Sequence, residues 1–280
     1  MIQFKDNVRL LRPSIGTATL TSSVFNLLNT MIGAGMLGLP AAFGASGLLP
    51  GMCLLVTAAC LAAFGLHLLC EAADATRRPA SFYSVAEAAV PGLGLLMDIA
   101  VFGVCFGSAC GYLIIVGDSV PAALASFAVD GALLDRRLWI GVATAAVAPL
   151  TFLKDVHSLR HTSQLSLACV AAVSLLIVAF FVGTEADLID PCDGGAPDCR
   201  GAIAGVAADG RAVLGAIPIF IFAFTCHQNV FSITNELREP TGARTLQLVV
   251  ATTGAGGVIF LAVATSGYAT FGEHVASDVL

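Results

Sequence analysis

The fold of this chain is decided by the stretch FNLLNTMIGAGMLGLP, residues 25–40. It is apolar enough to cross a bilayer, yet Gly33, Gly35 and Gly38 follow one another closely within it. A glycine in the interior of a helix costs about 1 kcal/mol relative to alanine. Backbone that leaves the helix at membrane depth is tolerated only where it is buried in protein or lines a cavity. The stretch therefore predicts an interrupted membrane helix whose exposed backbone binds a solute.

The composition of the whole chain places it in a membrane. Of the 280 residues, 57% are hydrophobic and 11% are charged, and the mean hydropathy is +0.90. Soluble domains carry about 25% charged residues, so these values indicate an integral membrane protein. The longest polar stretch, residues 183–211, is shorter than an ordinary domain and is interpreted as a loop. The charges are distributed among the loops, so a lipid bilayer is the expected surrounding and nucleic acid is not an expected partner.

Apolar runs close to the length that crosses a bilayer, about 20 residues, recur along the chain. A short interfacial helix is expected within residues 81–92. Seven spans are predicted, the first and the sixth of them interrupted: residues 18–44, 47–70, 95–127, 138–153, 163–183, 212–235 and 245–271.

The basic residues predict the orientation in the membrane. With the N-terminal tail, residues 1–17, in the cytoplasm, nine of the 13 Lys and Arg residues fall on the cytoplasmic side. This asymmetry is what the positive-inside rule describes. Cys192 and Cys199 then face the outer or lumenal side, where an oxidising compartment would let them form a disulfide. A metal site at this pair is not expected, because no histidine is near it.

The sixth span, residues 216–237, reads AIPIFIFAFTCHQNVFSITNEL and changes abruptly from apolar to polar in its middle. The polar run extends from Thr225 to Asn229, at a depth where lipid would penalise it. Polar residues inside spans usually face a cavity or the interior of the bundle, which makes these residues functional candidates. Two interrupted spans, five apart in order, predict inverted repeats with a binding site near the midplane.

These stretches resemble the amino acid/auxin permease family, and most closely its sodium-coupled neutral amino acid transporters. Further matching segments are GYLIIVGDSVP (111–121), PLTFLKDVHSLRHTS (149–163) and GYATFGEHVASDVL (267–280). The resemblance implies an all-α integral membrane protein with the LeuT-like inverted-repeat fold of the APC superfamily, in which helices 1 and 6 are broken. Residues 18–183 would form the first five-helix repeat, 184–211 the outer loop and 212–280 the start of the second repeat. Family members usually continue beyond a seventh span, so we expect this sequence to be a C-terminally truncated fragment.

The resemblance implies secondary active transport of neutral amino acids by a cation symporter. Alternating access would operate around a site between the broken helices. The alternative is a sensor or interaction subunit that binds an amino acid without moving it. An enzyme is not expected, because no HExxH, GxSxG or Walker pattern is present. The plasma membrane and vacuolar or lysosomal membranes all remain open, as do the particular amino acid and the oligomeric state.

The substrate is expected to be held by the backbone at both interruptions. Free N–H groups in the first would bind the carboxylate, as helix N-termini bind anions. The carbonyl groups from Phe222 to Thr225, together with the Thr225 hydroxyl, would accept hydrogen bonds from the ammonium group of the substrate. The side-chain pocket would involve Phe224, Cys226 and His227. For Phe224 the alternative is a role in packing. His227 either forms a structural hydrogen bond or titrates near physiological pH, which would confer pH sensitivity or proton coupling. The carboxylate-binding residues are Ile32, Gly33, Ala34 and Gly35.

No cofactor is expected apart from a coupling ion, Na⁺ or H⁺. In the resembling transporters an asparagine of the first span contributes to cation binding, and Asn29 occupies that position. The carbonyls of Thr30 and Met31 are expected companions, while hydroxyl ligands expected from an eighth span are not in this sequence. Asp118, near the outer end of the third span, is either a proton carrier or a solvated vestibule residue.

Overall fold

The computed structural model describes residues 16–76, 78–127, 131–149, 160–185, 192, 199–206 and 209–275. Apart from one isolated bridge, the regular structure in these residues is helical. The α-helices are α1 (Leu20–Met31), α2 (Leu39–Ser46), α3 (Leu48–Ala75), α4 (Phe82–Ala89), α5 (Gly94–Ser126), α6 (Arg136–Val147), α7 (Arg160–Glu185), α8 (Gly210–Ala223), α9 (Val230–Glu236) and α10 (Gly242–Phe271). The fold class is therefore all-α, as predicted.

Five stretches of helix in the described residues are long and apolar enough to cross a membrane, and they match five of the seven predicted spans. They are Leu48–Ala75, Gly94–Ser126, Ser166–Thr184, Gly210–Glu236 and Gly242–His274. The predicted span 18–44 is divided between α1 and α2, whose 12 and 8 residues extend about 18 and 12 Å. The predicted span 138–153 contains the 12-residue α6, and residues 150–159 lie outside the described part. The predicted interfacial helix is α4.

The chain leaves the α-helix between α1 and α2, in the stretch that contains Gly33, Gly35 and Gly38. A 3-10 turn, Ala34–Met36, separates the two helices, and Gly38 is the N-cap of α2. Pro40 lies in the first turn of α2, where its missing N–H is tolerated. A continuous helix would instead bring the Pro40 ring against the carbonyl of Met36. The interruption therefore follows from the local sequence.

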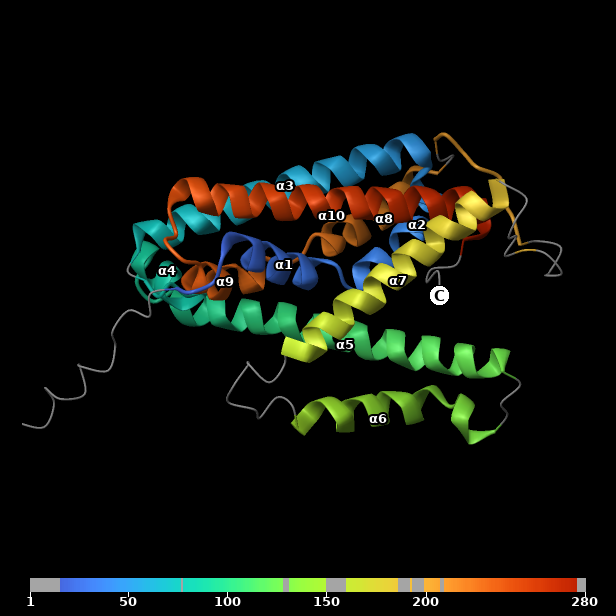
Figure 1. Cartoon of the computed structure of the whole chain (residues 1–280), viewed down its shortest axis with the longest axis horizontal. Coiled ribbons are helices and arrows are strands. Elements are labelled where there is room, and N and C mark those ends of the chain that lie inside the picture. The colour runs from blue at the N-terminus through green and yellow to red at the C-terminus, as the bar shows by residue number, and fades with distance from the viewer. Residues whose placement is uncertain are drawn as a thin grey trace, which may run out of the picture.

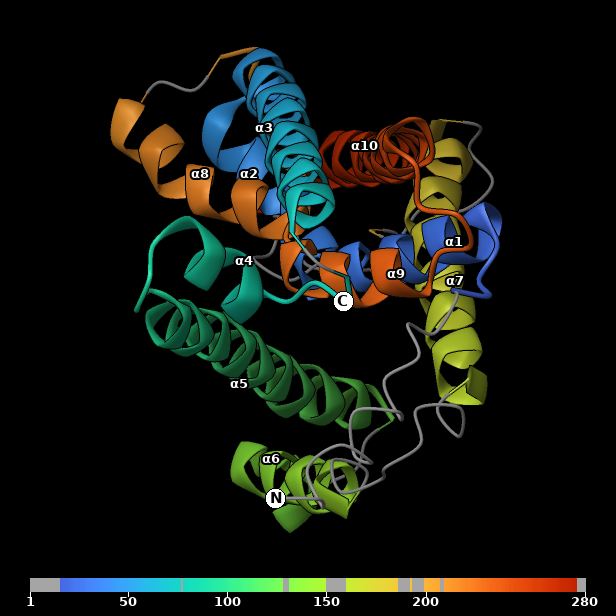
Figure 2. The same cartoon turned by 90° about the vertical axis from the view of Figure 1, so that its left-hand side faces the viewer.

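The buried core lies where α1 and α2 pack with α3, α8, α9 and α10. Helices α3 and α10 run side by side along one face, with α1 and α9 beneath them (Figures 1 and 2). Phe43 of α2 meets Phe220 of α8 with ring centroids 5.8 Å apart. Gly256 of α10 allows the sulfur of Met31 to approach closely, since a Cβ there would lie 2.5 Å from it.

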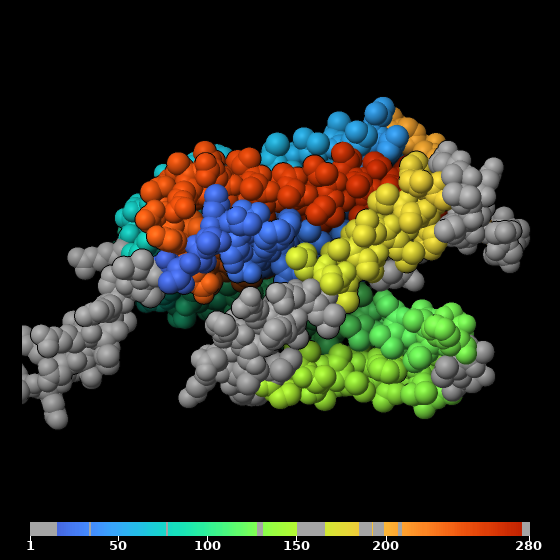
Figure 3. Space-filling model, in the orientation of Figure 1, coloured from blue at the N-terminus to red at the C-terminus, as the bar shows by residue number. Residues whose placement is uncertain are grey.

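Helices α5, α6 and α7 flank this core. Helix α5 pairs with α6 on the far side of α1 and α9 (Figure 2). In the space-filling view, α7 crosses obliquely from the end of α10 toward α5 (Figure 3). Gly117 of α5 lies against Ile140 of α6, because a Cβ on Gly117 would come 2.9 Å from the Ile140 side chain.

The segment 199–206 of the predicted outer loop covers one end of the bundle. Cys192 and Cys199 form a disulfide, with Cα atoms 5.7 Å apart. The backbone N–H groups of Leu48 and Leu49 donate to the carbonyls of Ala204 and Gly205, at 3.0 and 2.9 Å. These bonds satisfy donors at the start of α3 that have no partner within the helix.

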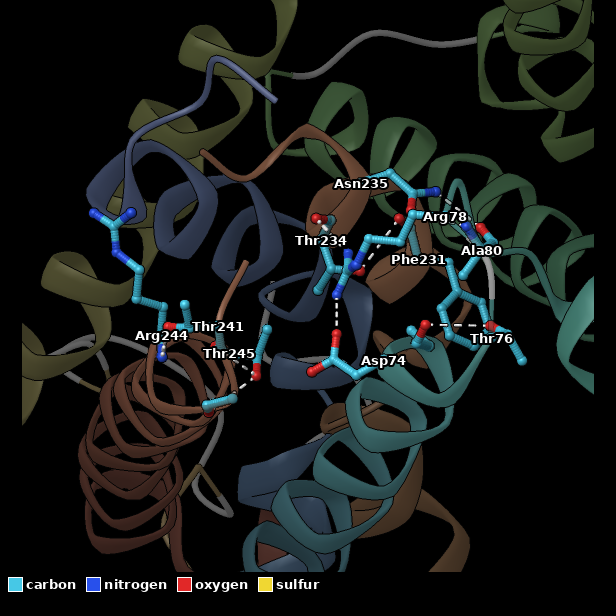
Figure 4. Close-up of polar contacts among 12 residues, drawn as sticks. Asp74, Thr76, Arg78, Ala80, Phe231, Thr234, Asn235, Thr241, Arg244 and Thr245 are labelled. Carbon is cyan, nitrogen blue, oxygen red and sulfur yellow. Dashed lines mark hydrogen bonds and ion pairs between the residues drawn. The ribbon is translucent and has the colours of Figure 1, made fainter. Parts of the chain in front are cut away.

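At the opposite end, a polar cluster ties the linker between α3 and α4 to α9 (Figure 4). Arg78 forms an ion pair with Asp74 and donates to the carbonyl of Thr234 at 3.0 Å. Asn235 donates to the carbonyl of Ala80 at 2.8 Å and accepts from its N–H at 3.0 Å. The end of α9 is also bound to the segment before α1, because the N–H of Ala18 donates to the carbonyl of Glu236 at 2.9 Å.

We predict that Asn235→Ala destabilises the protein. The substitution leaves the N–H and carbonyl of Ala80 without their partners, and Ala80 is 3% exposed. The free energy of unfolding should fall by about 1–3 kcal/mol, visible as a lower Tm in detergent. Asn26→Ala is the control, because the Asn26 side chain is exposed and has no hydrogen bond to the described residues. Equal Tm values for the two variants would contradict the prediction.

Candidate functional site

The two interruptions of the helical chain contact each other, although about 190 residues separate them. Gly35 lies against Ala223, the last residue of α8, and a Cβ on Gly35 would come 2.8 Å from the Ala223 Cα. The side-chain N–H of Asn229 donates to the Thr30 hydroxyl at 3.1 Å. The chain between α8 and α9 passes through Phe224 to Cys226 and a 3-10 turn, His227–Asn229. One close backbone contact and one hydrogen bond therefore hold the interruptions together.

A cavity of about 200 Å³, which we call the polar cavity, lies beside this contact. Its lining comes from α1, both interruptions, the end of α8 and the middle of α5. The lining residues are Asn29, Thr30, Met31, Gly33, Gly35, Ser108, Tyr112, Phe222, Thr225 and Gln228.

Two residues that line the polar cavity carry buried oxygens without a partner. The side-chain carbonyl oxygens of Asn29 and Gln228 accept no hydrogen bond within the described part of the chain. Leaving a buried acceptor unsatisfied costs about 1–3 kcal/mol. Native proteins keep few such groups, and those that persist often mark the position of a water or an ion. Both are oxygen acceptors of the kind that binds a cation or an ammonium group.

The backbone at the first interruption offers donors. Among the described residues, the N–H of Gly33 has no backbone acceptor, and its carbonyl accepts from the N–H of Met36 at 3.1 Å. Gly38, the N-cap of α2, provides no capping side chain. Free N–H groups at the start of a helix attract anions, through hydrogen bonding and the helix dipole. Donors and acceptors thus occur at the same cavity.

The structure brings together most of the residues predicted for the site. The polar cavity is lined by the predicted cation residues Asn29, Thr30 and Met31 and by the predicted substrate residues Gly33, Gly35, Phe222 and Thr225. Ala34 lies in the 3-10 turn between them. Ile32 lines a neighbouring cavity instead. The Thr225 hydroxyl donates to the carbonyl of Ile221 at 3.1 Å, which leaves its oxygen able to accept another bond.

Four other candidates lie outside the lining of the polar cavity. Phe224 packs edge-on against Phe260, with ring centroids 5.0 Å apart, and Cys226 is fully buried. The ring of His227 lies against Gly65 of α3, where a Cβ would come 2.9 Å from its Nε2 atom. Asp118 pairs with Arg136 of α6 at 2.8 Å, and about half of each side chain is exposed. These placements favour packing for Phe224, a structural position against α3 for His227 and a solvated position for Asp118.

Two lining residues, Ser108 and Tyr112, were missed as site candidates, and Gln228 was a functional candidate without an assigned role. Ser108 and Tyr112 are four residues apart in α5, so they lie on one face of that helix. Their polarity within an apolar span was an available signal, since such residues tend to face a cavity. Gln228 belongs to the polar run of the sixth span, but a helical register does not continue through an interruption. The sequence therefore could not show which member of the run faces the cavity.

These features define a multi-pass α-helical membrane protein with a polar cavity at two interruptions of its helices. Residues 16–280 match the family described as Transmembrane amino acid transporter protein, and the chain belongs to this family. The class and the family agree, because a polar solute that crosses a bilayer needs a cavity of this kind.

Curated relatives extend the comparison. The chain is 35% identical to Vacuolar amino acid transporter 5 of Schizosaccharomyces pombe, over 95% of the chain and 61% of that protein. It is 31% identical to Vacuolar amino acid transporter 6 of Saccharomyces cerevisiae, over 94% of the chain and 58% of that protein. Sodium-coupled neutral amino acid transporter 7 of Rattus norvegicus is 28% identical, over 96% of the chain and 58% of that protein. No solved structure matches the chain.

We predict that Gly35→Ala disrupts the contact between the interruptions. The added methyl group meets backbone atoms of Ala223, which cannot rotate away as a side chain could. Such overpacking typically costs about 1–3 kcal/mol, so the Tm in detergent should fall. The control is Gly103→Ala in α5, where a Cβ meets nothing within 4 Å. A Tm for Gly35→Ala equal to that of the control would show that the close approach is not required.

Proposed function

We propose that this chain forms the substrate- and ion-binding core of a secondary active transporter that carries neutral amino acids with Na⁺. The chain spans about 60% of the curated relatives that it matches, and their transport activity is transferred to it by this proposal. The observation that carries the proposal is the polar cavity, where the N–H of Gly33 lacks a backbone acceptor and the side-chain oxygens of Asn29 and Gln228 lack a partner among the described residues. A zwitterion needs both kinds of group once it is desolvated.

The carboxylate of the substrate is assigned to the first interruption. The N–H groups of residues 33–35, together with the start of α2, would replace the water that the carboxylate loses. The N–H of Ile32 is not free for this role, because it donates to the carbonyl of Leu28 at 2.8 Å. Support comes from the N–H of Gly33, which has no backbone acceptor among the described residues. Glycine at positions 33 and 35 lets the substrate approach the backbone closely.

The ammonium group is assigned to acceptors at the second interruption. The carbonyls from Phe222 to Thr225 and the Thr225 hydroxyl lie at the end of α8, whose macrodipole favours a positive charge. Phe222 and Thr225 both line the polar cavity, which supports this assignment. An ammonium group placed here would lie opposite the carboxylate, so the dipoles of α8 and α2 would act together on one zwitterion.

The coupling ion is assigned to Asn29, with the carbonyls of Thr30 and Met31. Coupling ions in transporters of this kind are bound by unwound carbonyls and the ends of half-helices. The unpaired oxygens of Asn29 and Gln228 support an oxygen-ligated cation. Among the described residues that line the polar cavity, none is Asp, Glu or His, so no strongly titrating group is available there. This favours Na⁺ over H⁺ as the coupling ion.

The fold that would move the substrate is the LeuT-like arrangement. In this assignment α1 and α2 are the halves of broken helix 1, and α8 and α9 are the halves of broken helix 6. Residues 18–183 then form the first repeat, and the second repeat starts at residue 212. Rocking of one bundle against the other would expose the polar cavity to each side in turn. The vacuolar relatives favour a vacuolar membrane over the plasma membrane, with the N-terminus in the cytoplasm.

Uptake by proteoliposomes tests the proposal. The 280-residue chain is reconstituted, and radiolabelled alanine and leucine are supplied outside with an inward Na⁺ gradient. The proposal predicts uptake that ceases when K⁺ replaces Na⁺. Saturable binding without uptake would favour the sensor alternative, and the absence of both would contradict the proposed function.

Asn29→Ala tests the ion site separately. We predict that the Na⁺ concentration for half-maximal leucine binding rises at least tenfold, because a ligand worth about 1.5–3 kcal/mol is lost. Leucine binding at saturating Na⁺ should change less. Asn26→Ala is the matched control, since it lies on the same helix with an exposed side chain. An unchanged Na⁺ response in Asn29→Ala would remove Asn29 from the ion site.

A further inference from the structure

A second cavity, of about 330 Å³, lies next to the polar cavity. It is bounded by the first interruption, by α5 and by α7, and we call it the apolar cavity. Its wall is made mainly of aliphatic side chains, among them Met36, Leu37, Ile115, Val170 and Val173. Within the described residues, the lining contains no charged side chain.

The two cavities share part of their lining. Asn29, Gly33 and Tyr112 line both of them. The Tyr112 hydroxyl lies directly over Gly33, since a Cβ on Gly33 would come 2.4 Å from it. The apolar cavity is therefore adjacent to a ligand whose polar end is held at the first interruption, and it lies on the side of α5 and α7.

The sizes of the cavities indicate which part of a ligand each one accepts. Pockets for small molecules usually have volumes of about 300–1,000 Å³, and the polar cavity by itself lies below this range. It suits the carboxylate and ammonium groups that all amino acids share. Of the two cavities, the apolar one has more room for a long side chain, and a charged side chain would find no oppositely charged partner in its lining.

We infer that the apolar cavity is the side-chain pocket of the transporter and selects amino acids with large aliphatic or aromatic side chains. This inference rests on the proposed function, which places the carboxylate and the ammonium group in the polar cavity. Each additional methylene group buried in the pocket should raise affinity about fourfold. Affinity should therefore increase from glycine through alanine to leucine and phenylalanine, and lysine and glutamate should bind poorly.

The test measures binding of radiolabelled leucine and alanine to the purified 280-residue chain in nanodiscs with Na⁺. Val173→Phe fills the pocket from α7 and should weaken leucine binding at least tenfold, while alanine binding changes less than threefold. The control is Leu175→Phe, two residues along the same helix, where the native side chain is 69% exposed. This variant should leave both affinities unchanged.

Equal weakening of leucine and alanine binding by Val173→Phe would overturn the inference, as would equal affinity of the unmodified chain for both. Failure of the chain to bind any amino acid would instead contradict the proposed function. Val170→Ala provides a second test that does not depend on overpacking. It enlarges the pocket and should raise the affinity for phenylalanine relative to leucine several-fold. An unchanged ratio would count against the pocket.

Discussion

Backbone that leaves the helix inside a membrane must find partners for its N–H and carbonyl groups, and the central part of this protein is arranged around that constraint. Both interruptions meet it in the same place. Gly35 brings the first interruption against the backbone of Ala223, and Asn229 binds Thr30 across the contact. The surrounding helices α3 and α10 cover this contact on one face, so that the irregular backbone is enclosed by protein (Figure 1).

The same constraint explains why the polar cavity is suited to a zwitterion, which carries both charges and no net charge. A buried oxygen without a partner among the described residues, as in Asn29 and Gln228, is unfavourable. In the proposed function a cation would relieve that penalty, and the N–H of Gly33, which has no backbone acceptor among the described residues, would bind the carboxylate. In this proposal the fold prepares the binding energy for ion and substrate, while α5 and α7 shape the apolar cavity. Selectivity is thus assigned to the apolar cavity and ion binding to the polar cavity. Asn29 and Tyr112 line both cavities.

Much of the fold could be predicted from the sequence, because periodic apolar runs and glycine clusters act locally. The positions of α3, α5, α7 and α10 follow from their apolar lengths. The disulfide partners followed from their position in one short polar loop. The sequence could not show which residues of the polar run from Thr225 to Asn229 face the cavity, because helical periodicity does not predict side-chain directions across an interruption. The ring of His227 lies against Gly65 on α3, whereas its neighbour Gln228 lines the polar cavity. The contribution of Tyr112 depends on how α5 packs against Gly33, which is a tertiary contact.

The central claim is that the backbone of both interruptions holds the substrate. Hydrogen–deuterium exchange, followed by mass spectrometry on the 280-residue chain, measures this directly. With saturating leucine and Na⁺, peptides that cover residues 28–38 and 222–229 should exchange more slowly than in K⁺ without leucine, while peptides from α6 should not change. Saturable leucine binding that leaves exchange at both interruptions unaltered would contradict the account.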